Sequence, residues 1–150
     1  RLILALVVSL GAGVISWLLT GNSMEMYANI KKPPLSPPGQ VFPIVWTILF
    51  VLMGVASYIV CETRDDDRME ALILYGVQLF VNVGWSVIFF DFGAFWLAFF
   101  WLMLLWGLII FTVWRFFHVN KVAAWMMVPY LLWVTFAAYL NLAVAIINVK

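Results

Sequence analysis

Residues 94–117 read AFWLAFFWLMLLWGLIIFTVWRFF, and this stretch decides the class of fold. Its one charged residue, Arg115, lies close to its end, and its length exceeds the ~20 apolar residues that a helix needs to cross a bilayer. Backbone groups in lipid must pair within their own segment, and the alternation of a barrel strand is absent. The stretch therefore predicts a transmembrane α-helix.

The whole chain has the composition of an integral membrane protein. Of its 150 residues, 67% are hydrophobic and 10% are charged, whereas soluble domains have roughly 25% charged residues. The charges divide the chain into five apolar runs, each near or above membrane-spanning length. We expect an all-α bundle of five transmembrane helices that forms a single domain over residues 1–150. The spans are residues 2–20, 42–61, 69–90, 94–117 and 122–149.

The first apolar run follows an arginine and has to be distinguished from a signal peptide. It ends in WLLT, residues 17–20, rather than in a small-x-small cleavage site, which favours a membrane span. With five spans the two termini lie on opposite sides of the membrane, and the distribution of Lys and Arg favours a cytoplasmic N-terminus. Arg1, Arg64, Arg68, Arg115 and Lys121 share the N-terminal side, against Lys31, Lys32 and Lys150 on the other.

The connection between the first two spans is rich in proline. Residues 31–43 read KKPPLSPPGQVFP, and these prolines exclude a helix and leave the backbone few conformations. Pro43 stands where the next helix begins, a position that tolerates a missing N–H, and Trp46 follows in the first turn. We therefore expect a stiff connection that forms one wall of a binding site at the mouth of the bundle.

Three spans place polar or aromatic residues on one helical face. Gln78 and Asn82 are spaced i, i+4, and amides in hydrocarbon need partners, so these faces are expected to turn inward. Two interpretations stay open: interhelical hydrogen bonds that hold the bundle, or an aromatic cavity whose few amides orient a large, flat, apolar ligand. The faces comprise Gln78, Asn82, Trp85, Ser86 and Phe89; Trp133, Ala137, Leu140 and Asn141; and Trp46, Phe50, Met53 and Ser57.

Residues that commonly carry chemistry are missing from the interior of the spans. No Asp, Glu, Lys, Arg or His stands well inside one, so a proton relay, an ion-coupling site or a metal centre has no candidate. We predict no catalytic residue and no required cofactor. The net charge of +1 gives no reason to expect a nucleic-acid partner.

Small residues recur on the first span. Ala5, Ser9 and Gly13 are spaced by four residues, which allows another helix backbone to approach closely. We expect this face to pack within the bundle, and a homodimer interface is the alternative.

Three separated motifs carry a resemblance to a known family. The first begins at Tyr27, the second covers residues 78–90, and the third covers residues 129–141. At this order and spacing they resemble the TspO/MBR family, the tryptophan-rich sensory proteins related to mitochondrial translocator protein. The motif residues are Tyr27, Lys31-Lys32-Pro33, Pro37-Pro38, Val41-Phe42, Val45-Trp46 and Leu49; Gln78-Leu79, Asn82, Trp85 and Phe89-Phe90; and Pro129-Tyr130-Leu131, Trp133, Phe136 and Leu140-Asn141.

The resemblance implies a function and a site. It implies a sensor or transporter that binds porphyrins, notably protoporphyrin IX, and that also binds benzodiazepine and isoquinoline-type drugs. For a bacterial-type member it implies the bacterial cell membrane. A light-dependent porphyrin-degrading enzyme and a structural membrane partner are the alternatives. The ligand-binding residues that the resemblance implies are Tyr27, Pro37, Trp46, Asn82, Trp85, Trp133, Phe136 and Ala137.

Overall fold

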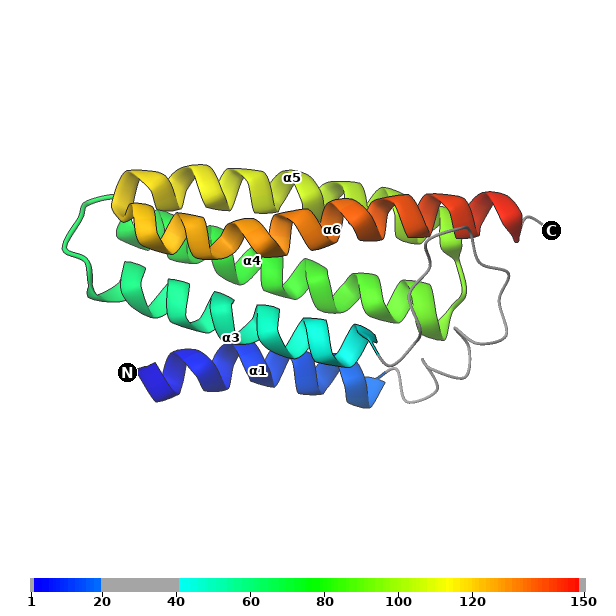
Figure 1. Ribbon diagram of the computed structural model, residues 1–150, viewed down its shortest axis with the longest axis horizontal. Coiled ribbons are helices and arrows are strands. Elements are labelled where there is room, and N and C mark those ends of the chain that lie inside the picture. The colour runs from blue at the N-terminus through cyan, green and yellow to red at the C-terminus, as the bar shows by residue number, and fades with distance from the viewer. Residues whose placement is uncertain (1, 20–40, 149–150) are drawn as a thin grey trace.

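The protein is an all-α bundle, as the sequence predicts (Figure 1). The computed structural model describes residues 2–19 and 41–148, and no β-strand occurs within these ranges. Five helices are long and apolar enough to cross a membrane, and their bounds lie close to those of the predicted spans. The segments are α1 (Leu2–Leu19), α3 (Val41–Glu62), α4 (Arg68–Ser86) with its π-helical extension η1 (Val87–Asp91), α5 (Phe95–Val119) and α6 (Lys121–Ile147).

The helices lie side by side along the long axis of the molecule (Figure 1). Contact is most extensive between α5 and α6, while α4 packs on α5, α1 packs chiefly on α3, and α3 also packs on α6. At one end of the bundle α1 and α6 end, α3 begins, and α4 passes into η1 (Figure 1). We call this the C-terminal end of the bundle. Residues 20–40, which include Tyr27, Pro37 and the proline-rich connection as far as Gln40, lie outside the described residues.

The small residues of α1 pack against α3, which confirms their predicted role within the bundle. Ser9 is the buried residue of α1, and a Cβ added at Gly54 of α3 would lie 2.6 Å from the Ser9 Oγ. A Cβ added at Gly13 would lie 2.8 Å from the ring of Phe50. The two backbones therefore approach closely because glycine stands at each contact, as in other membrane helix pairs.

The corner between α5 and α6 is tighter than the sequence predicts. We expected residues 118–121 to form the connection, but α5 continues to Val119 and α6 begins at Lys121. Asn120 alone connects them, and its backbone is extended (φ −158°). Its Oδ1 accepts hydrogen bonds from the backbone N–H groups of Val122 (2.9 Å) and Ala123 (3.3 Å). These bonds satisfy N–H groups that otherwise lack a partner at a helix start.

The end of α4 changes its helical period. The Phe92 N–H donates to the Val87 carbonyl at 3.3 Å, an i to i+5 bond of the π-helical type. The chain then turns at Gly93, whose φ of +58° favours glycine, and α5 begins. Across the end of α4 and η1, residues i and i+5 therefore lie close to the same face of the helix. In a regular α-helix, residues i and i+5 point in different directions.

The predicted inward faces are buried except at Trp46, Ser86 and Trp133, which are half-buried. Gln78, Asn82 and Asn141 are at most 2% exposed, and Phe50, Met53 and Ser57 of α3 are buried. Pro43 lies in the first turn of α3, where a proline is tolerated. The amides thus face the bundle interior, where each requires a hydrogen-bond partner.

Candidate ligand-binding site

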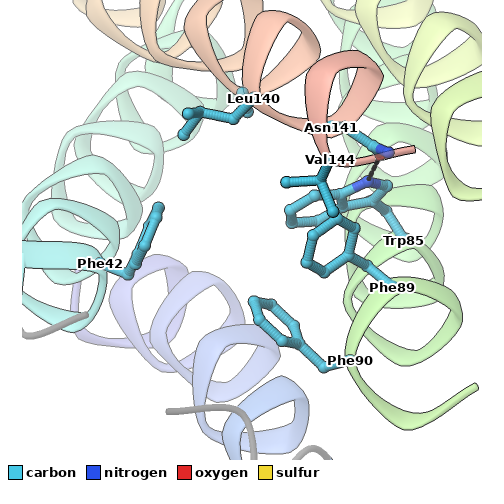
Figure 2. Close-up of a pocket in the computed structure, with 8 residues that line it drawn as sticks. Phe42, Trp85, Phe89, Phe90, Leu140, Asn141 and Val144 are labelled. Atoms are coloured by element: carbon cyan, nitrogen blue, oxygen red, sulfur yellow. Dashed lines mark hydrogen bonds between the residues drawn. The ribbon is translucent and has the colours of Figure 1, made fainter. Parts of the chain in front are cut away.

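A hollow lies among the side chains at the C-terminal end of the bundle (Figure 2). Its cavity volume is about 20 Å³, and a cavity of about 10–15 Å³ by the same kind of measure holds one water molecule. The hollow therefore admits one small group. Its lining comes from α3, α4, η1 and α6, and consists of Phe42, Trp85, Phe89, Phe90, Ala137, Leu140, Asn141 and Val144.

Phe42 supplies one wall from the first turn of α3. In Figure 2 its ring lies across the hollow from Trp85 and Phe89. The Phe42 ring also meets the Trp133 ring edge-on, with the centroids 5.8 Å apart. Trp133 is thereby placed behind the wall rather than on the hollow itself, since it is not a lining residue.

Three aromatic side chains from α4 and η1 form the facing wall. The Trp85 and Phe89 rings are 5.3 Å apart, and the Phe89 and Phe90 rings are 4.8 Å apart in an edge-on arrangement. Trp85 and Phe90 also meet, at 6.1 Å. Phe90 reaches the hollow because the π-helical turn brings position i+5 back toward the face that carries Trp85. The three rings form one contiguous aromatic surface, an arrangement suited to flat apolar ligands.

The remaining lining comes from one face of α6. Ala137, Leu140, Asn141 and Val144 are spaced i, i+3, i+4 and i+7, and all are buried. Ala137 is the smallest of the lining residues, so its position leaves room that a larger side chain would fill.

The polar atoms of the lining side chains are bonded to each other and to the backbone. The Trp85 Nε1–H donates to the Asn141 Oδ1 at 2.9 Å, and the Asn141 Nδ2 donates to the Phe95 carbonyl at 2.9 Å. The other lining side chains are hydrocarbon. Because the indole and the amide satisfy one another, the surface that they present to the hollow is apolar (Figure 2).

A second polar network lies deeper in the bundle and joins three helices. The Asn82 Nδ2 donates to the Tyr130 hydroxyl at 2.7 Å, and this hydroxyl donates to the Gln78 Oε1 at 2.7 Å. The Gln78 Nε2 is in turn 3.9 Å from the Met53 Sδ. For Gln78 and Asn82 the structure therefore supports the first of the two interpretations, interhelical hydrogen bonds that hold the bundle.

The structure brings together part of the predicted site. Trp85 and Ala137 line the hollow. Trp46 packs against Tyr130, with ring centroids 6.1 Å apart. Trp46 and Asn82 therefore contact the same residue of the deeper network. Neither Trp46 nor Asn82 is a lining residue.

The other predicted residues lie farther from the hollow or are not described. Phe136 packs against Trp133 at 5.5 Å and against Tyr139 at 6.2 Å, and it does not line the hollow. Tyr27 and Pro37 lie outside the described residues, so their part in the site stays a prediction.

Six of the eight lining residues are missing from the predicted site: Phe42, Phe89, Phe90, Leu140, Asn141 and Val144. Phe89, Leu140 and Asn141 were expected on inward faces but not as site residues. Phe42 and Phe90 stand within the family motifs, and Val144 stands one turn beyond Leu140 on the predicted inward face of α6. Extending that face by i+4 would have found Val144. No α-helical period would have found Phe90, because the π-helical turn places it.

The ion pair of the described residues lies far from the hollow, near the end of α5 and the start of α4. Arg115 donates to Glu70, and its guanidinium lies 5.3 Å from the centre of the Trp114 ring. Among residues 2–19 and 41–148, no three His, Cys, Asp or Glu side chains are grouped as metal ligands. The described residues that line the hollow are all neutral.

The fold and site define a class: integral membrane proteins with a five-helix bundle and an aromatic hollow at one end. The family model for the TspO/MBR family matches residues 3–147. The chain therefore belongs to the TspO/MBR family.

Its relatives span bacteria and animals. It is 39% identical to "Tryptophan-rich protein TspO" of Chlorobaculum tepidum over 124 residues, which covers 81% of this chain and 78% of the relative. It is 35% identical to "Tryptophan-rich sensory protein" of Cereibacter sphaeroides, over 78% of this chain and 73% of the relative. It is 34% identical to "Translocator protein" of Homo sapiens, over 91% of this chain and 82% of the relative.

Proposed function

We propose that this protein is a membrane sensor or transporter that binds a tetrapyrrole of the protoporphyrin IX type at the C-terminal end of the bundle. The names of its relatives, tryptophan-rich sensory protein and translocator protein, support a sensory or transport role in a membrane. The aromatic hollow supports a flat apolar ligand. By the same chemistry, we extend the proposal to benzodiazepine and isoquinoline-type drugs.

The observation that carries the proposal is the contiguous aromatic surface of Trp85, Phe89 and Phe90 facing Phe42 across the hollow. Stacked or edge-on aromatic contacts contribute roughly 0.5–1.5 kcal/mol each beyond the area they bury. The edge of a macrocycle that meets these rings gains affinity without any polar contact inside the bundle.

The cavity volume limits how the ligand sits. A cavity of about 20 Å³ holds one small group, not a macrocycle. We therefore place only the edge of the tetrapyrrole in the hollow, with the rest of the ring over the end of the bundle where α3 begins. Its carboxylates stay outside, because a carboxylate among neutral hydrocarbon walls has no partner. Tyr27 and Pro37 remain part of the proposed site through the family resemblance.

Two further points belong to the proposal. The bacterial relatives support a bacterial cell membrane as the location. A homodimer would have to use a surface other than the Ser9 and Gly13 face of α1, since that face packs on α3.

A dark titration with protoporphyrin IX tests the proposed function. When protoporphyrin IX is added to detergent-solubilised protein, the tryptophan fluorescence should be quenched saturably because Trp85 lies at the hollow. The saturation point should correspond to one site per chain. Empty micelles at the same detergent concentration are the control for porphyrin that partitions into detergent. A signal that rises linearly with porphyrin and matches the micelle control would contradict binding.

A further inference from the structure

Two polar side chains stand among the described residues that line the hollow. Trp85 and Asn141 carry the polar atoms of the lining side chains, and the indole N–H and the amide oxygen are bonded to each other at 2.9 Å. The amide N–H₂ is bonded to the Phe95 carbonyl at 2.9 Å, which fixes the orientation of the amide with its oxygen toward the indole. Each polar atom of the Trp85 and Asn141 side chains therefore already has a hydrogen-bond partner.

The volume of the hollow sets the size of the group that enters. A volume of about 20 Å³ is somewhat more than the roughly 10–15 Å³ that holds one water molecule, which limits the entering group to a small substituent. The walls are aliphatic and aromatic, and Ala137 has the smallest side chain among the lining residues. Size and polarity together select a small apolar substituent at the edge of a larger ligand.

We propose that the hollow is a subsite for one small alkyl or vinyl substituent of the tetrapyrrole edge, and that Asn141 is a specificity-determining residue that keeps the subsite apolar by occupying the Trp85 N–H. This inference rests on the proposed function, since it assigns the part of that ligand that enters the hollow. Among the described residues, a hydroxyl on the substituent would meet hydrocarbon walls and polar atoms that each already have a hydrogen-bond partner, in exchange for the water that it loses. Burying an unpaired hydroxyl is costly, and apolar pockets discriminate against an added hydroxyl by up to about a hundredfold.

Asn141 acts through Trp85 rather than by touching a polar group of the ligand. If Asn141 is replaced by leucine, the Trp85 N–H is free to donate to a ligand hydroxyl. If Trp85 is replaced by phenylalanine, the Asn141 Oδ1 is free to accept from it. Either change therefore opens the subsite to a hydroxyl, although the two changes remove different side chains. A residue that only supports the fold would not have this effect.

A porphyrin series with identical propionates tests the subsite. Mesoporphyrin IX carries ethyl groups where protoporphyrin IX carries vinyl groups, and haematoporphyrin IX carries 1-hydroxyethyl groups there. In the wild-type protein we expect mesoporphyrin and protoporphyrin to bind with similar dissociation constants, and haematoporphyrin to bind about tenfold or more weakly. In Asn141→Leu and in Trp85→Phe the haematoporphyrin-to-mesoporphyrin ratio of dissociation constants should fall toward one.

Gln78→Leu is the matched control. Gln78 is as buried as Asn141 and also bonds between helices, but it belongs to the deeper network with Tyr130. Its loss should leave the ratio at the wild-type value even if every porphyrin binds more weakly. Partition into micelles is the same for all variants, so it cancels when the ratios are compared.

The outcomes separate the inference from the proposed function. If no porphyrin binds saturably, the proposed function fails and this inference fails with it. If all three porphyrins bind equally well to the wild type, the subsite is wrong while porphyrin binding stands. A wild-type ratio that persists in both Asn141→Leu and Trp85→Phe would show that this pair does not set the specificity. Should Asn141→Leu fail to fold, Trp85→Phe decides alone.

Discussion

Ala137→Leu should reduce the affinity for protoporphyrin IX by about a hundredfold while the helices remain intact. Ala137 is 6% exposed and lines a hollow of about 20 Å³, and leucine adds three carbon atoms at that point. The added side chain occupies the space proposed for the ligand edge, and single methylene differences in a fitted pocket change affinity by roughly 10–200-fold. Fluorescence titration measures the dissociation constant, and circular dichroism measures the helix content.

Ala143→Leu is the matched control for this substitution. Ala143 lies on the same helix, is half-buried and does not line the hollow. Its replacement should change the dissociation constant by less than about threefold, within the scatter expected of a position away from the site. Equal loss of affinity in the two variants would place the ligand elsewhere.

Tyr130→Phe should lower the free energy of unfolding by roughly 1–3 kcal/mol. The Tyr130 side chain is fully buried, and its hydroxyl accepts from Asn82 and donates to Gln78. The substitution removes the partner of the Asn82 Nδ2 and of the Gln78 Oε1. An interhelical hydrogen bond in a membrane protein contributes about 0.6 kcal/mol on average and up to about 1.7 kcal/mol, and an orphaned polar group adds its own cost. Unfolding in mixed micelles of increasing denaturing detergent measures the loss.

A fully apolar version of the network provides the control. Combining Tyr130→Phe with Gln78→Leu and Asn82→Leu removes the partners together, so no buried group is orphaned. This triple variant should be more stable than Tyr130→Phe alone. If Tyr130→Phe unfolds at the wild-type detergent concentration, the network does not hold the bundle.

The fold could be predicted from the sequence because membrane insertion leaves few alternatives. A run such as residues 94–117 must be helical in lipid, since its backbone groups have no other partners. The contact of Ser9 and Gly13 with α3 was also predictable from small residues at four-residue spacing, although the partner helix was not. The single-residue corner at Asn120 was not predicted, because its cap depends on the side-chain conformation as well as on the residue type.

The lining of the hollow could be predicted only in part, for two physical reasons. Helical periodicity shows which residues turn inward, but it does not distinguish an amide that binds a ligand from one that pairs with another helix. The Asn82 amide pairs with Tyr130, whose hydroxyl lies on a distant segment of the chain. The π-helical turn brings Phe90 to the hollow, and this change of period leaves no mark in the hydrophobic pattern.

Fluorine NMR of protein labelled with 5-fluorotryptophan tests most directly whether the ligand binds at the C-terminal end of the bundle. The chain has nine tryptophans, and single Trp→Phe variants assign their resonances. On addition of protoporphyrin IX the ring current of the macrocycle should shift the Trp85 resonance most. Trp114 lies near the other end of the bundle and is 53% exposed, so its resonance should stay in place. A shift of Trp114 with Trp85 unchanged would contradict the account.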